Sequence, residues 1–112
     1  MAKLVRLRRL AADDIEAALD YYLTSAGVDV ARRFLAAAQR GLSQLSRQPQ
    51  VGSLRFAFEL DIPELRAWPI TKFPYLVFYV ERDAEIDVWR LLHTSRDIPA
   101  TLADRNDPDE GH

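Results

Sequence analysis

Cationic side chains in the second half of the chain have the types needed for metal-free cleavage of RNA. That reaction requires a base for the 2′-hydroxyl proton, an acid for the leaving oxygen and cations beside the phosphate. Arg66, His93 and Arg96 could fill these roles if the fold brings them together. The same residues are also consistent with the solvent-facing side of ordinary strands, so both interpretations stay open at this point.

Metal, cofactor and triad chemistry are not supported by the spacing. The chain has no cysteine, and neither of its two histidines, His93 and His112, has a second ligand three or four residues away. Its four glycines are isolated, so there is no phosphate-binding loop. Thr94 and Ser95 follow His93, but adjacent residues on a strand point to opposite faces. We predict no metal and no cofactor.

Aromatic side chains interleave with these cations and could stack on bases or anchor a protein partner. Large aromatic residues at period-two spacing more often belong to a core, and we assign Phe78 and Trp89 there. Trp68 and Tyr75, on either side of Lys72, are the pair that we expect at the surface.

Length and composition indicate one small globular domain. The chain has 112 residues, of which 48% are hydrophobic, and a net charge of −2. Residues 104–112 form a polar, acidic tail, and residues 1–103 carry 14 basic against 13 acidic side chains. A nearly neutral domain argues against a general nucleic-acid binder. No apolar run approaches the length of a membrane span and no export signal is visible, so we expect a cytoplasmic protein.

Hydrophobic periodicity predicts an α+β fold in the order β-α-α-β-β-β-β with a short C-terminal helix. Asp13 and Glu16 have the spacing of a capping box, and the short break at residues 25–27 makes the two helices an antiparallel hairpin. We expect this hairpin on one face of an antiparallel sheet. The predicted strands are residues 3–10, 54–60, 66–71, 75–80 and 86–92, and the predicted helices are residues 13–24, 28–46 and 98–103.

Several short motifs occur together in the order and spacing of one protein family. They are residues 12–15, 21–22, 31–34, 45, 49, 52, 65–66, 68–70, 73–79 and 92–99. Together they resemble the RelE/ParE superfamily of bacterial type II toxins, and the resemblance covers residues 5–102. The ending Leu-His-Thr-Ser-Arg-Asp-Ile-Pro is most similar to ParE-like members.

The resemblance implies a cognate antitoxin similar to ParD, with a DNA-binding N-terminal domain and a flexible C-terminal tail that wraps the toxin. Residues 3–10 and 66–71, if they are edge strands, could accept an added strand, and the helical hairpin offers an apolar groove. Arg6, Arg8 and Arg9 would attract an acidic tail, although a soluble strand face explains them equally well. The residues that we assign to antitoxin binding are Arg6, Arg8, Arg9, Tyr22 and Phe34.

The superfamily divides by target. ParE-like members poison DNA gyrase by stabilising its cleaved DNA complex, which requires neither catalytic residues nor a small-molecule substrate, whereas RelE-like members cut messenger RNA in the ribosome. Few lysines, a nearly neutral domain and no tyrosine after Tyr79 favour gyrase. The alternatives are a ribosome-dependent endonuclease that uses Arg66, His93 and Arg96, and a non-toxic partner-binding module. We assign target binding to Arg66, Trp68, Lys72, Tyr75, Arg90, His93 and Arg96.

Overall fold

The computed structural model of the chain describes residues 2–103, so the predicted tail lies outside the described residues. In chain order the elements are β1 (Leu4–Leu7), α1 (Arg9–Ser25), α2 (Val28–Arg47), the single-turn helix η1 (Pro49–Val51), α3 (Arg55–Leu60), β2 (Arg66–Pro69), β3 (Tyr75–Glu81), β4 (Glu85–His93) and α4 (Ile98–Ala103). The predicted α+β class, the helical hairpin and the short C-terminal helix are confirmed.

The four strands form one sheet in the order β1-β4-β3-β2. The pairs β2–β3 and β3–β4 are antiparallel, but β1 runs parallel to β4, so the sheet is mixed where we predicted it to be antiparallel. The physical reason is that β1 and β4 lie far apart in the sequence. Their relative direction depends on the path of the intervening chain, which the periodicity of single segments does not encode.

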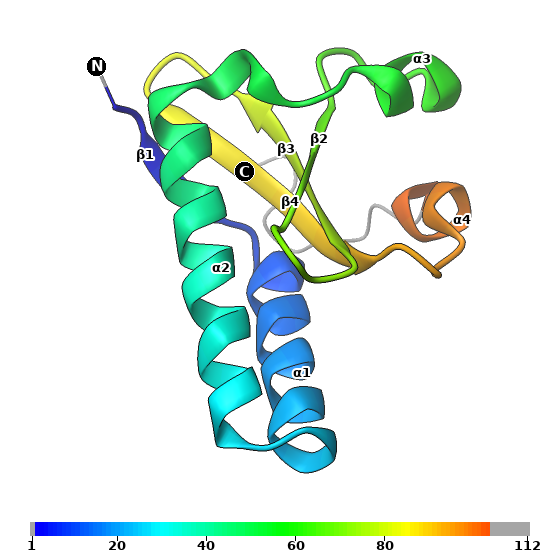
Figure 1. Cartoon of the computed structure of the whole chain (residues 1–112). Helices are drawn as coiled ribbons and strands as arrows, with labels where there is room; N and C mark the ends of the chain where they lie inside the picture. The colour runs from blue at the N-terminus through cyan, green and yellow to red at the C-terminus, as the bar shows by residue number, and fades with distance from the viewer. Residues whose placement is uncertain (1, 104–112) are drawn as a thin grey trace.

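Helices cover both faces of the sheet, as Figure 1 shows for the hairpin of α1 and α2 on one side and for α3 and α4 on the other. One core cluster joins the hairpin residues Phe34 and Leu45 to Val77 of β3, and a second joins Phe56 of α3 and Leu102 of α4 to the opposite face. The predicted core positions of Phe78 and Trp89 are confirmed. Within residues 2–103, none of the helices has the length and apolar character required to cross a membrane.

The segment predicted as a strand at residues 54–60 is instead the short helix α3. Phe56 is buried and its ring lies 5.2 Å from that of Phe78, whereas the side chain of Phe58 is 82% exposed. Apolar residues at every second position suggested a half-buried strand, but Phe56 and Leu60 also share a helical face. Good helix formers surround them, and Asp61 ends the helix in the left-handed region at φ 53°.

The first helix begins four residues earlier than predicted, and the strand before it ends at Leu7. Asp13 and Glu16 therefore lie inside α1 and form no capping box. Arg8 occupies the N-cap position without a side-chain hydrogen bond to the helix. The backbone amide of Arg8 donates to Val88 of β4, which fixes the point where strand becomes helix.

The pairing of β3 with β4 shifts register between Phe78 and Tyr79, where Phe78 faces Arg90 and Tyr79 faces Val88. Trp89 is thus an extra residue on β4, a β-bulge. Because side chains alternate along a strand, one extra residue exchanges the faces of everything that follows. After the bulge Leu91 packs with the hairpin cluster, and His93 comes to lie beside Tyr75.

Candidate functional site

The sheet separates the residues proposed for RNA cleavage. Arg66 pairs with Tyr79 at one end of β3, and His93 pairs with Tyr75 at the other. Tyr79 and Tyr75 are four residues apart along the strand, which corresponds to about 13 Å. Arg66 therefore does not lie beside His93 and Arg96, and the acid, base and phosphate clamp of a ribonuclease are not assembled from these three residues.

Arg66 holds the chain that leaves the helical hairpin. Its Nη1 donates to the carbonyl oxygens of Gln50 at 3.1 Å and Gly52 at 2.8 Å. The buried hydroxyl of Tyr79 donates to the Pro49 carbonyl and accepts from the Gly52 amide. Burial raises the pKa of Tyr79, so this hydroxyl stays protonated and can donate. These contacts give Arg66 a structural role in this fold.

His93 is hydrogen-bonded to the chain just beyond β4. The backbone amide of Ser95 donates to its Nδ1 at 3.0 Å, and the Ser95 hydroxyl lies 2.8 Å from the same atom. Because a backbone N–H can only donate, Nδ1 is the acceptor and the neutral ring carries its proton on Nε2. His93 therefore has no free Nδ1 lone pair with which to act as a base.

Four of the seven residues assigned to target binding gather at one end of the sheet, and we call Trp68, Lys72, His93 and Arg96 the sheet-end surface. Lys72 is exposed in the turn between β2 and β3 with φ 69°, and the carbonyl of Pro74 in this turn accepts from the amide of Thr94, next to His93. Arg96 is exposed, and Trp68 is half-buried.

Tyr75 and Arg90 do not belong to this surface. Tyr75 is only 9% exposed, and its ring lies beside those of Phe34 and His93, so the expectation that it is a surface anchor was wrong. Arg90 makes two hydrogen bonds to the carboxylate of Asp14 in α1, at 2.7 and 2.9 Å. It fastens the helical hairpin to β4, where it is largely buried.

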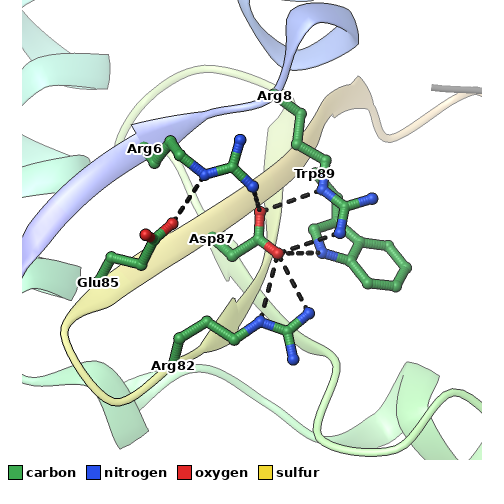
Figure 2. Close-up of polar contacts among 6 residues, drawn as sticks. All are labelled: Arg6, Arg8, Arg82, Glu85, Asp87 and Trp89. Atoms are coloured by element: carbon green, nitrogen blue, oxygen red, sulfur yellow. Dashed lines mark hydrogen bonds and ion pairs between the residues drawn. The ribbon is translucent and has the colours of Figure 1, made fainter. Parts of the chain in front are cut away.

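A cluster of ion pairs centred on Asp87 ties β1 to β4 (Figure 2). Asp87 is buried, and its Oδ1 accepts from Arg6 and Arg8. Its Oδ2 accepts from Arg8 at 3.0 Å, and also from Arg82 and the indole nitrogen of Trp89 at 3.2 Å each. Three guanidinium groups thus converge on one carboxylate.

The charge of Asp87 is stabilised by these donors. Burial by itself would raise the pKa of this carboxyl, but the hydrogen bonds and charge of Arg8, together with hydrogen bonds from Arg82 and Trp89, lower it below its ordinary value. Arg8 also lies 4.4 Å from the centre of the Trp89 ring. The carboxylate is therefore ionised at neutral pH, and Arg8 is part of the core.

The residues assigned to antitoxin binding consequently divide into buried and accessible groups. Arg8 is 6% exposed and Phe34 is fully buried, so neither can contact a partner directly. Tyr22 is half-buried above Phe34, with ring centres 5.3 Å apart. Arg6 remains 41% exposed while it contacts Glu85 and Asp87, and Arg9 is exposed at the start of α1.

The comparisons with known proteins agree with this arrangement. The family model described as "ParE toxin of type II toxin-antitoxin system, parDE" matches residues 5–98. The chain belongs to the ParE toxin family. A solved structure titled "Chromosomal ParDE TA system from P. aeruginosa" has the same fold, with a TM-score of 0.69, 18% identity, and coverage of 82% of this chain and 96% of that one. No curated protein sequence matches the chain.

This member of the ParE family has two different sheet edges. The outer edge of β2 is closed, because the amide and carbonyl of Ala67 both bond to Ser53 and Pro69 has no amide hydrogen. The expectation that this strand accepts a partner was therefore wrong. On β1, the bond from the Arg8 amide to β4 implies that Val5 and Leu7 direct their backbone groups outward.

Sequence reasoning missed Asp87 and Asp14. A signal existed for Asp87, because a lone acid between Ile86 and Val88 in a buried strand requires a cationic partner. Asp14 gave no such signal, since it stands in a polar stretch of the first helix. Among residues 2–103 no group of three or more histidine, aspartate or glutamate side chains is arranged to hold a metal ion.

Proposed function

We propose that this chain is the toxin of a type II toxin-antitoxin system and that it inhibits DNA gyrase by stabilising the cleaved DNA complex. The observation that carries the proposal is the ParE family match over residues 5–98. The separation of Arg66 from His93 along β3 supports it, because a poison of this kind needs a binding surface and no acid–base machinery. The gyrase itself would break the DNA.

For gyrase binding we propose the sheet-end surface. It combines a half-buried indole at Trp68 with the cations Lys72 and Arg96, and interfaces favour aromatic and arginine side chains of this kind. Among residues 2–103 the side chains of Lys72 and Arg96 have no ion-pair partner, so a target carboxylate or phosphate would be their first.

For the cognate antitoxin, similar to ParD, we propose strand addition at the outer edge of β1. This edge offers the backbone groups of Val5 and Leu7, and Leu4 beside them is 73% exposed. An acidic antitoxin segment would also meet Arg6 and Arg82, which Asp87 orients and which remain 41% and 48% exposed. The neutralised toxin would then exist as a complex in the bacterial cytoplasm.

The test is a plasmid supercoiling and cleavage assay with the purified toxin, gyrase from the same host and ATP, run with and without the antitoxin. Accumulation of gyrase-linked broken plasmid, relieved by the antitoxin, is the expected result. The double variant Lys72→Ala with Arg96→Ala should lose this effect, whereas Arg55→Ala, which removes an exposed cation from α3, should keep it.

A folded toxin that leaves gyrase unaffected would overturn the proposal. Ribosome-dependent cleavage of messenger RNA would then be measured, with His93→Ala and Arg96→Ala as the first variants. If neither activity appears while the antitoxin still binds, the chain is a partner-binding module without toxicity.

A further inference from the structure

The outer face of α2 carries a row of arginines along the whole helix. Arg33, Arg40 and Arg47 are exposed and recur every seven residues. Seven residues advance an α-helix by about 10.5 Å and return nearly to the same side, so the three guanidinium groups span about 21 Å on one face. Arg32 is exposed beside them, and Asp29 is the acidic residue of this face.

The surface between these arginines is hollowed. A shallow depression of about 500 Å³ lies along the helix and is lined by Ala36, Gln39, Arg40, Ser43, Gln44 and Arg47. Small side chains at positions 36 and 43 let a partner approach the helix closely, while hydroxyl and amide groups border the depression. All the polar side chains of this lining can donate hydrogen bonds, and two of them are permanently charged.

The positive charge of this face is not neutralised within the fold. Arg8, Arg82 and Arg90 each bind a carboxylate. Arg40 and Arg47, in contrast, have no ion pair among residues 2–103. Three of the four exposed acids of the hairpin, Asp13, Glu16 and Asp20, belong to α1, and α2 contributes the fourth, Asp29. The net charge of the domain is therefore close to zero although α1 carries most of the exposed acids of the hairpin and α2 carries the row of arginines.

The chemistry of this face favours a phosphate backbone over a protein partner. Protein interfaces are anchored by large apolar or aromatic side chains, and no large hydrophobic residue is exposed on α2 between Asp29 and Arg47. Contacts to nucleic-acid backbones come from arginine, serine and glutamine side chains, the types present here. We propose that α2 binds the sugar-phosphate backbone of duplex DNA through Arg33, Arg40 and Arg47, without reading base sequence.

The size of the surface fits this ligand. At 3.4 Å per base pair, 21 Å covers about six base pairs, and each phosphate contact releases counterions. Three contacts give a slope of log K against log salt of about −2.7, so affinity falls about 40-fold between 50 and 200 mM salt. The proposal concerns the toxin alone and does not require gyrase to be its target.

The experiment is fluorescence anisotropy of a labelled 20-base-pair duplex of arbitrary sequence, titrated with the purified full chain at several salt concentrations. Arg40→Gln should make the slope shallower by about 0.9, because one phosphate contact is lost. Arg40→Lys should retain most of the slope because it keeps the charge. Arg55→Gln removes an exposed cation from α3 and should leave the slope unchanged.

Equal slopes for Arg40→Gln and Arg55→Gln, or no binding at 50 mM salt, would overturn the proposal. A poly-glutamate peptide titrated in parallel tests the other class of partner. If that peptide binds through Arg40 and the duplex does not, α2 recognises an acidic protein segment and the DNA assignment is wrong. Since gyrase is absent from the assay, failure here is distinct from failure of the proposed function.

Discussion

Replacing Asp87 by asparagine tests whether the buried ion cluster holds β1 on β4. The two side chains have nearly the same shape, but asparagine is neutral and presents an NH₂ group in place of one oxygen. The carboxylate of Asp87 now accepts hydrogen bonds from N–H groups of Arg6, Arg8, Arg82 and Trp89. In either orientation of the asparagine amide, its NH₂ group would face two or more of these donors. The substitution also leaves the charge of buried Arg8 without its partner.

The expected loss of unfolding free energy is about 3–5 kcal/mol, the usual result of removing one member of a buried ion pair. The side chains of Asp87 and Arg8 are 3% and 7% exposed, so solvent screens them little. For a domain of this size such a loss lowers the melting temperature by on the order of 10–20 °C. Arg82→Gln is the control, because Arg82 is 48% exposed and its loss should cost about 0–1 kcal/mol.

The assay is urea unfolding followed by circular dichroism at pH 7 and at a series of acidic pH values. Because the folded-state pKa of Asp87 lies below its ordinary value of 3.8, its stabilisation is complete above that pH and disappears as the pH falls through the folded value. Asp87→Asn should therefore flatten this part of the acid profile. A loss below about 1 kcal/mol at pH 7 with an unchanged denaturant slope would refute the view that this cluster anchors β1.

Three further predictions concern packing. Phe56→Ala should cost about 3–5 kcal/mol and Phe58→Ala less than about 0.5 kcal/mol in urea unfolding, and equal costs would contradict the helical assignment of α3. Gly52→Ala should lower the melting temperature, because an added Cβ would lie 2.5 Å from the buried hydroxyl of Tyr79. An unchanged melting temperature would show that the loop around Gly52 can move aside. Arg90→Ala should speed hydrogen exchange in α1, since the carboxylate of Asp14 loses its charged partner and keeps the bond from the backbone amide of Leu91; unaltered exchange would assign the ion pair no anchoring role.

The hairpin and the central strands could be predicted because their signals are local. Apolar residues at helical spacing mark α1 and α2, and the apolar run at residues 75–80 predicted the strand β3. The family could also be recognised, since motif order and spacing survive in the linear sequence. The strand prediction for residues 54–60 was wrong because the pattern is ambiguous. Phe56, Phe58 and Leu60 fit the two-residue period of a strand, while Phe56 and Leu60 also lie on one helical face.

The prediction of functional residues was less accurate, because residue type does not reveal which cationic side chains are paired within the fold. Arg8, Arg66 and Arg90 hold parts of the structure together through hydrogen bonds. Arg96 is the same residue type but is exposed. Each is separated from its carboxylate or carbonyl partner by many residues. Only the folded chain shows which charges are neutralised and which are available to a partner.

The sequence by itself determined the α+β class, the helical hairpin, the core positions of Phe78 and Trp89 and the ParE-like family, because each follows from local periodicity or motif spacing. The tertiary structure decided the parallel pairing of β1 with β4 and the separation of Arg66 from His93. It also decided the face on which His93 lies, through the bulge at Trp89. These depend on register and on contacts between residues distant in the chain, and neither leaves a periodic trace in the sequence.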